Sequence, residues 1–215
     1  MENNSELSTL RSSYERAELE EGRMLDDPLA ELRVWLDAAI AARTVEPNAF
    51  CLATAALDGA PSARMVLLRG LDARGVVFYT NYESRKGAQL RVQPLAAATF
   101  WWGALERQVQ LEGTVEPLSD EESDTYFASR PRGHRLSAWA SEQSRTIESR
   151  ALLDERMLDF ETRFEGEDVP RPHSWGGFLI KPSRVEFWQG RKNRMHDRIE
   201  YSRSGSQWRR QRLQP

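Results

Sequence analysis

Cysteine and histidine are scarce in this sequence of 215 residues, which holds one Cys and three His. The single Cys51 excludes an internal disulfide and every metal site that needs several cysteines. The three histidines, His134, His173 and His196, show no close metal-ligand spacing. We therefore expect no metal site built by the protein, and a core that forms by apolar burial alone.

Long apolar runs and nucleotide-binding loops are also missing. No run approaches the roughly 18 apolar residues that a membrane-spanning helix needs, and the N-terminus lacks the basic and apolar regions of a signal peptide. We therefore expect a soluble, cytoplasmic protein without a membrane partner. The sequence contains neither G-x-G-x-x-G after a strand nor G-x-x-x-x-G-K-[ST], so a phosphorylated cofactor would have to be held by side chains.

Charge is balanced over the whole chain but not along it, with 30 Lys+Arg, 33 Asp+Glu and a net charge of −3. Residues 1–31 carry nine acidic and three basic side chains, whereas residues 181–215 carry ten basic and three acidic ones. A nucleic-acid-binding protein is usually basic as a whole. The basic tail therefore favours a site for a small anion, and we expect no nucleic-acid partner.

The N-terminal part predicts two helices. Residues 5–21 are polar and charged with few apolar anchors, so we expect a weakly attached helix, with residues 1–25 as a mobile segment beside a single domain of residues 26–215. Asp27 and Pro28 are typical of a helix start. The buried face of that second helix is expected to hold Leu29, Leu32, Leu36 and Ile40.

From residue 49 onward the apolar pattern becomes that of β-strands. Asp58-Gly59 predicts a hairpin turn between strands at 49–57 and 62–69. Further strands are expected at 76–81, 95–102, 106–117, 175–180, 184–189, 194–202 and 207–213, and helices at 119–129 and 147–165. The sequence thus predicts a mainly β protein with helices, and closure into a barrel or split β-barrel would remove its exposed strand edges.

Three segments carry candidate binding residues. In the first, Ser84, Arg85 and Lys86 follow a strand and open a short helix, which is the outline of a phosphate site and equally that of a solvated first turn. In the second, a predicted strand would place Arg194, His196 and Arg198 on one face, either around an anion or open to water.

The third segment lies at the end of the helix that is predicted to begin at residue 119. Tyr126 and Arg130 lie four residues apart on one helical face and would together grip a phosphate. Taken alone, such a pair is more often a surface contact.

In their order along the chain, these segments resemble the FMN-dependent pyridoxine/pyridoxamine 5′-phosphate oxidases. The resemblance covers nearly the whole chain. The matching stretches are Arg64-Met65-Val66-Leu67-Leu68-Arg69, Phe78-Tyr79-Thr80-Asn81 with Ser84-Arg85-Lys86, Glu106-Arg107-Gln108-Val109, Tyr126-Phe127 with Ser129-Arg130-Pro131, Ala138-Trp139-Ala140-Ser141 with Gln143-Ser144, Trp175-Gly176-Gly177-Phe178, and Glu186-Phe187-Trp188-Gln189-Gly190 with Arg194 and His196-Asp197-Arg198.

The resemblance implies a split β-barrel homodimer with FMN bound at the subunit interface. By position, the FMN-binding residues would be Arg64, Met65, Val66, Leu67, Leu68, Arg69, Tyr79, Thr80, Arg85, Lys86, Gln108, Gln143, Ser144, Trp188 and Arg198. The substrate-binding residues would be Arg11, Tyr14, Arg69, Tyr126, Arg130, His134, Arg194 and His196. Arg194 and His196 would meet the pyridine ring as catalytic residues, and Arg11 and Tyr14 would belong to a lid.

Three features depart from the family pattern. Arg69 stands at a site typical of Lys, and His134 stands where many members have a Ser that contacts the substrate phosphate. The lid reads Arg11-Ser12-Ser13-Tyr14, without the central charged pair often found there. These departures concern substrate affinity more than the chemistry.

The activity that the resemblance implies is oxidation of pyridoxine or pyridoxamine 5′-phosphate to pyridoxal 5′-phosphate, with O₂ as acceptor and H₂O₂ as product, in vitamin B6 biosynthesis and salvage. Two alternatives stay open. One is another flavin or deazaflavin enzyme on the same barrel, such as an oxidase of phenazine assembly. The other is a non-catalytic carrier of flavin or pyridoxal phosphate.

Overall fold

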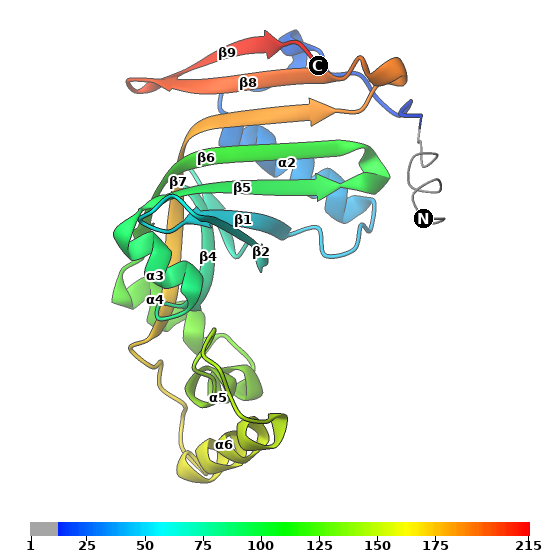
Figure 1. The fold of residues 1–215 in the computed structure, drawn as a ribbon. Coiled ribbons are helices and arrows are strands. Elements are labelled where there is room, and N and C mark those ends of the chain that lie inside the picture. Colours follow the sequence, from blue (N-terminus) through cyan, green and yellow to red (C-terminus); the bar gives the residue numbers. More distant parts are fainter. Residues whose placement is uncertain (1–12) are drawn as a thin grey trace, which may run out of the picture. The chain divides into compact units, whose positions relative to one another are not determined.

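The computed structural model describes residues 13–215. The chain divides into two compact units, which we call the terminal unit (Met1–Pro47, Thr99–Leu111 and Ser183–Pro215) and the central unit (Asn48–Ala98 and Glu112–Pro182). The described residues contain nine strands, hydrogen-bonded in the order β2-β1-β5-β6-β7-β4-β3, with β8 paired to β7 and β9 to β8 (Figure 1). Strands β5 (Leu95–Trp102), β6 (Arg107–Pro117) and β7 (Trp175–Gln189) contribute residues to both units.

Three antiparallel pairings shape the sheet of the central unit. Strands β1 (Ala49–Ala55) and β2 (Pro61–Leu67) form the predicted hairpin, with Leu52 opposite Arg64. Strand β4 (Gly75–Asn81) pairs with the short β3 (Gly70–Asp72) and with the first part of β7, so that Tyr79 lies opposite Gly177. The alternation of these strands places Tyr79 on one face and Thr80 on the other.

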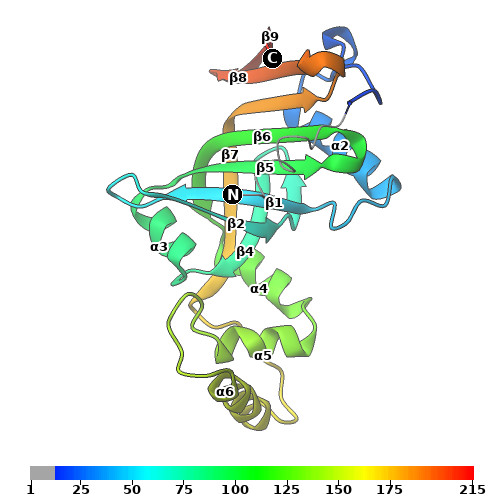
Figure 2. The ribbon, with the colours of Figure 1, turned by 45° about the vertical axis from the view of Figure 1, so that its right-hand side comes forward.

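Local capping signals explain the helices of the central unit. Ser84 caps α3 (Arg85–Val92), and Ser119 with Glu122 forms the predicted capping box of α4 (Asp120–Ala128). The sequence analysis did not predict α5 (Arg132–Ala140), which begins directly after Pro131. Helices α5 and α6 (Arg150–Arg163) lie against each other in Figures 1 and 2, around a small core of Leu136, Phe164 and Val169.

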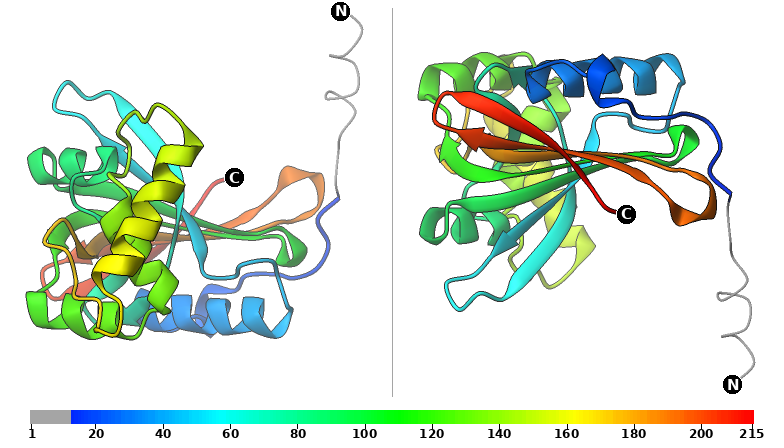
Figure 3. Two further views of the ribbon diagram at one scale, coloured as in Figure 1. Left: turned by 90° about the horizontal axis from the view of Figure 1, so that it is seen from below. Right: turned by 90° about the horizontal axis from the view of Figure 1, so that it is seen from above.

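The terminal unit packs one long helix against the C-terminal strands. Asp27 accepts a hydrogen bond from the backbone N–H of Leu29 at the start of α2 (Pro28–Ala41), as predicted. The ring of Trp35 contacts Phe187 of β7 at 5.0 Å between centroids. Strands β8 (Asp197–Ser204) and β9 (Gln207–Leu213) run side by side, as the right panel of Figure 3 shows. Short 3₁₀ turns cover Glu21–Arg23, Gly103–Leu105 and Lys192–Arg194.

Several predictions of elements are wrong. Residues 13–20 contain no helix, while the rest of the predicted N-terminal helix, 5–12, lies outside the described residues. Ile40 is 52% exposed, and Trp35 takes its expected place on the buried face of α2. The strands predicted on either side of Pro182 are one strand, β7, in which Pro182 itself is buried.

The predicted strand over 194–202 begins later than expected. Asn193 and Arg194 both have left-handed backbone angles, φ +55° and +61°, so the chain turns there and β8 starts only at Asp197. Arg194, His196 and Arg198 therefore do not share one strand face. Among residues 13–215, no helix is long and apolar enough to cross a membrane.

Candidate functional site

A cavity of about 850 Å³ opens in the central unit, and its wall holds four cationic side chains and no carboxylate. The cations are Arg64, Arg69, Lys86 and Arg130, and none of them forms an ion pair with a carboxylate in the described part of the chain. The remaining lining is polar or aromatic, except for the apolar Met65, Val66, Leu67 and Pro131. Because the chain as a whole is negative, four uncompensated cations in one cavity indicate a site for anions.

Lys86 is the most buried of these cations, and neutral groups hold it. Its Nζ donates hydrogen bonds to Thr80 Oγ1 at 2.9 Å and to Gln143 Oε1 at 2.7 Å. Burial, and to a lesser degree the charge of Arg64, lowers the pKa of Lys86 to about 8. An anion in the cavity would offset this penalty and favour the charged amine.

Arg64 is held by neutral acceptors as well. Its guanidinium donates to the carbonyl of Leu52 at 3.2 Å, to Thr54 Oγ1 at 2.6 Å and to Ser62 Oγ at 2.8 Å. Burial lowers the pKa of Arg64, with a smaller contribution from the charge of Arg85. The side chain therefore keeps a fixed position without losing its charge to a carboxylate.

Aromatic rings line the cavity beside Arg130. Tyr79 and Tyr126 stack at 3.8 Å between centroids, and Trp175 lies parallel to both. The guanidinium of Arg130 lies 4.4 Å above the ring centre of Trp175, and its Nη1 is buried without a hydrogen-bond partner among the described residues. A buried donor without a partner is costly, so this nitrogen indicates a place where a ligand oxygen binds.

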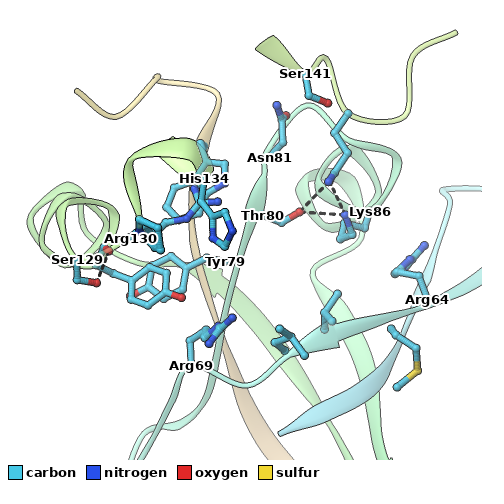
Figure 4. A pocket seen from close by; sticks show the side chains of 17 residues that line it. Arg64, Arg69, Tyr79, Thr80, Asn81, Lys86, Ser129, Arg130, His134 and Ser141 are labelled. Carbon is cyan, nitrogen blue, oxygen red and sulfur yellow. Dashed lines mark hydrogen bonds between the residues drawn. The ribbon is translucent and has the colours of Figure 1, made fainter. Parts of the chain in front are cut away.

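The cations form two groups within the cavity. Figure 4 shows Arg69, Arg130 and His134 on the side of the Tyr79 ring, and Arg64 and Lys86 on the other side, beyond Thr80. In the first group, Arg130 follows α4, His134 lies on α5 and Arg69 lies between β2 and β3; in the second, Arg64 lies on β2 and Lys86 on α3. The geometry thus offers two anion subsites rather than one.

The structure brings together most of the site residues predicted within the central unit. Those that line the cavity are Arg64, Met65, Val66, Leu67, Arg69, Tyr79, Thr80, Lys86, Tyr126, Arg130, His134 and Gln143. Leu68 is buried in the core, and the exposed Arg85 and Ser144 do not line the cavity. Arg85 still lies near enough to Arg64 to affect its pKa.

A second group of predicted residues belongs to the terminal unit. We call Tyr14, Trp188 and His196 the aromatic cluster: Trp188 lies 4.6 Å from His196 between centroids, and Tyr14 lies 5.8 Å from each. Trp101, which the sequence analysis did not single out, lies 5.9 Å from Trp188. Arg11 lies outside the described residues.

His196 is held as a neutral ring. The backbone N–H of Arg191 donates to its Nδ1 at 3.1 Å, which leaves the proton of the neutral imidazole on Nε2. Burial, with a smaller contribution from Arg194, lowers the pKa of His196. The ring can therefore donate one hydrogen bond from Nε2 to a ligand atom.

The other predicted residues of the terminal unit have different surroundings. Trp188 and Arg198 are register partners on β7 and β8. Arg198 donates to both oxygens of Glu186, at 2.8 and 3.0 Å, so a carboxylate already neutralises it. Arg194 is exposed at the end of its 3₁₀ turn, and Gln108 is half-buried on β6.

Sequence reasoning missed several residues of the cavity wall. They are Asn81, Ser129, Pro131, Ser141 and Trp175, and all of them stand inside the stretches that carry the resemblance. Trp175 had the clearest signal, because it begins a strand after a proline-rich link. No group of three or more His, Cys, Asp or Glu among residues 13–215 is arranged to hold a metal ion.

Comparison with known families assigns both halves of the sequence. The family model described as "Pyridoxamine 5'-phosphate oxidase" matches residues 36–163, and the model described as "Pyridoxine 5'-phosphate oxidase C-terminal dimerisation region" matches residues 175–215. Together they include both the cavity and the aromatic cluster except Tyr14.

Full-length relatives and a solved structure agree with this assignment. The pyridoxine/pyridoxamine 5'-phosphate oxidase of Rubrobacter xylanophilus is 54% identical over 98% of this chain and 97% of its own, and that of Salinibacter ruber is 54% identical over 98% of this chain and 100% of its own. PhzG from Burkholderia lata, solved in complex with tetrahydrophenazine-1-carboxylic acid, is 32% identical, covers 95% of this chain and 100% of its own, and superimposes with a TM-score of 0.89. These similarities confirm the predicted split-barrel fold. The chain belongs to the pyridoxamine 5′-phosphate oxidase family.

Proposed function

We propose that this protein is an FMN-dependent oxidase that converts pyridoxine or pyridoxamine 5′-phosphate to pyridoxal 5′-phosphate, with O₂ as acceptor and H₂O₂ as product. The observation that carries the proposal is the pair of cationic groups in one carboxylate-free cavity. Two phosphorylated ligands, a flavin mononucleotide and a pyridoxine-type phosphate, would supply one anion to each group. The names of the full-length relatives agree with this substrate.

The residues present fit the phosphate of FMN on the side of Arg64 and Lys86. Both cations are partly or largely buried and carry no ion pair with a described carboxylate, and Lys86 has a lowered pKa that an anion would restore. Thr80 and Gln143 fix the amine by hydrogen bonds. When bound there, the flavin would supply the hydride-accepting redox chemistry, and the protein would supply orientation and electrostatics.

The other cationic group fits the phosphate of the substrate. Arg130 presents an unpartnered buried nitrogen beside Tyr126, and Arg69 and His134 line the same part of the cavity. Charge-assisted hydrogen bonds from these groups would anchor the substrate through its phosphate. The anchor then fixes the position of the ring, which is the main contribution we expect from this part of the chain.

The residues of the terminal unit would complete the site from a second subunit. Residues 175–215 match a dimerisation region, and Gln108, Trp188, Arg194, His196 and Arg198 belong to the same unit. We propose a homodimer in which these residues meet the cavity of the partner chain. There the Nε2–H of His196 and the guanidinium of Arg194 would hold the pyridine ring.

Two measurements test the proposal. The purified protein should bind FMN and turn yellow, and it should consume O₂ and form pyridoxal 5′-phosphate from pyridoxamine 5′-phosphate but not from pyridoxamine. Arg130→Ala and Arg194→Ala chains should be mixed at a pyridoxamine 5′-phosphate concentration low enough for each variant alone to show little activity. The mixture should then restore about a quarter of the wild-type activity if each site uses both chains. Activity that stays absent in the mixture would show that one chain supplies both arginines.

A second candidate function has one observation in its favour, the 32% identity to PhzG over nearly the whole chain. A tricyclic substrate without a phosphate would leave Arg69, Arg130 and His134 without an anion. We therefore favour the phosphorylated substrate. Faster turnover of a reduced phenazine carboxylate than of pyridoxamine 5′-phosphate would reverse this order.

A further inference from the structure

Residues 13–20, which we call the strap, belong to the terminal unit and form neither helix nor strand. The carboxylate of Glu106 accepts hydrogen bonds from two consecutive backbone N–H groups of the strap, that of Glu15 at 2.9 Å and that of Arg16 at 3.1 Å. Tyr14 directly precedes these residues. The carboxylate therefore fixes the backbone from which the Tyr14 ring projects.

The backbone of Glu106 is an outlier that supports a special use of its side chain. Glu106 has left-handed angles, φ 55° and ψ 38°, which glycine adopts without steric cost and glutamate does not. Two hydrogen bonds hold this turn in place: the Glu106 carbonyl accepts one from the N–H of Gly190 at 2.8 Å and one from Gln189 Nε2 at 3.2 Å. A strained residue that persists in such a turn indicates that its side chain is needed.

The Tyr14 ring packs against Gly190, at a position that we call its seat. A Cβ atom built on Gly190 would lie 2.7 Å from Cγ of Tyr14 and 2.9 Å from its Cβ, so only glycine leaves room for the ring. From this seat Tyr14 meets the edges of Trp188 and His196. The seat and the carboxylate of Glu106 adjoin each other, because the same Cβ would lie 3.1 Å from that of Glu106.

Other contacts of the strap are weaker or more distant from Tyr14. The ion pair Glu15–Lys192, at 3.1 Å, joins two exposed side chains, and in the pair Glu18–Arg191, at 2.8 Å, the carboxylate is exposed, so both pairs contribute little. The N–H of Leu19 donates to Asp197 at 3.1 Å, but Leu19 lies five residues beyond Tyr14. Glu106 thus accepts the backbone hydrogen bonds of the strap that lie closest to Tyr14.

We propose that Glu106 is a positioning residue of the active site: by binding the strap at residues 15 and 16, it holds Tyr14 against Trp188 and His196. This inference rests on the proposed function, in which His196 contacts the substrate, and on the expectation from the family resemblance that Tyr14 does so too. Glu106 itself would not touch the substrate. Its removal should therefore affect substrate binding while the cations of the cavity remain unchanged.

The first test measures the strap directly, without reference to activity. In the full-length protein, Glu106→Ala should increase amide hydrogen exchange in the peptide containing Glu15 and Arg16 by roughly tenfold or more. Glu106→Gly should have the same effect on exchange while keeping or raising the unfolding temperature, because glycine relieves the left-handed strain. Glu20→Ala is the matched control, since Glu20 lies on the same strap and its one ion pair within residues 13–215 is with the exposed Arg23.

The second test connects the strap to catalysis. With FMN bound, Glu106→Ala should raise the Michaelis constant for pyridoxamine 5′-phosphate by about tenfold and leave the FMN affinity unchanged. In the Tyr14→Ala background the same substitution should add almost nothing, because Glu106 acts through Tyr14. Glu106→Gln, which keeps one acceptor oxygen, should lie between the wild type and Glu106→Ala.

The outcomes separate the inference from the proposed function. Unchanged exchange at residues 15 and 16 in Glu106→Ala would overturn the anchoring role. Faster exchange with unchanged kinetics, or full additivity with Tyr14→Ala, would overturn the positioning role. A wild-type protein that binds FMN but does not oxidise pyridoxamine 5′-phosphate would refute the proposed function, while the exchange result would still decide whether Glu106 anchors the strap.

Discussion

The cations of the cavity in the central unit and those beside the aromatic cluster of the terminal unit have different partners. In the cavity, Lys86 and Arg64 are held by hydroxyl, amide and carbonyl oxygens, and no described carboxylate neutralises them. Around the aromatic cluster, Arg198 is paired with Glu186, and Arg191 with Asp197 and Glu18. Positive charge thus stays uncompensated inside the cavity, where phosphates would bind, whereas carboxylates neutralise Arg191 and Arg198 beside the aromatic cluster.

The largest effect is expected from a substitution on the substrate side of the cavity, which is the group of Arg69, Arg130 and His134. Arg130→Ala removes one or more charge-assisted hydrogen bonds worth ~1.5–3 kcal/mol each, so the Michaelis constant should rise by roughly 10- to 150-fold, with a smaller effect on turnover. Arg163→Ala is a matched control, because Arg163 also stacks on aromatic rings but lies on α6 outside the cavity. Equal Michaelis constants in wild type and Arg130→Ala would remove Arg130 from the phosphate site.

The next largest effect is the pH dependence of FMN binding on the cofactor side of the cavity, which is the group of Arg64 and Lys86. Lys86 is charged below its pKa of about 8 in the free protein and neutral above it. The phosphate of FMN is a dianion throughout pH 7 to 9, so FMN affinity should fall by about tenfold between these values as Lys86 loses its proton. Titrations of flavin fluorescence at several pH values measure this fall. The same slope in Lys86→Met would assign the pH dependence to another group.

The stability of the FMN-free protein should change with pH in the opposite direction to the FMN affinity, and increase at high pH. The pKa of Lys86 is lower in the folded protein, about 8, than in the unfolded chain, so the unfolded chain binds more protons in between. The Lys86 contribution to the free energy of unfolding should therefore increase as the pH rises from about 8 toward about 10.4. Comparing urea unfolding of the wild type with that of Lys86→Met isolates this contribution.

A smaller effect is expected from the neutral cluster. His196→Ala removes one hydrogen bond to the substrate ring, so flavin reduction should slow by about tenfold while FMN stays bound. Because the ring is neutral, this loss should not depend on ionic strength. Stopped-flow absorbance of the flavin measures the rate, and release of FMN from the variant would instead place His196 at the cofactor.

The smallest effect should come from His134, which is exposed at the edge of the substrate side. His134→Ser replaces an imidazole with a hydroxyl at the same place, and we expect the Michaelis constant to change by roughly 2- to 10-fold. Steady-state kinetics with pyridoxamine 5′-phosphate test this. If the Michaelis constant changed as much as in Arg130→Ala, His134 would instead be a main ligand of the phosphate.

Local signals in the sequence predicted much of the fold and the residues of the cavity. The capping box at Ser119, the Asp27-Pro28 helix start and the bounds of β5 follow from neighbouring residues alone, and the structure has them. The cavity residues that share a strand or a helix end, such as Tyr126 with Arg130, were predictable for the same reason.

The errors arise where distant contacts override local preference. The strap is polar and would suit a helix, but its N–H groups bind Glu106 and Asp197, which lie far along the chain. The turn at Asn193 and Arg194 breaks an alternating pattern that looks like a strand. β7 continues past Pro182 because pairing on both sides of that residue supports it.

The central claim is that one cavity with uncompensated cations receives two phosphates. The most direct measurement loads the wild-type protein with FMN and then titrates pyridoxal 5′-phosphate and unphosphorylated pyridoxal, following the flavin absorbance. We predict one pyridoxal 5′-phosphate per chain, bound at least about 100-fold more tightly than pyridoxal. Equal affinity for the two compounds, or displacement of FMN by pyridoxal 5′-phosphate, would contradict the account.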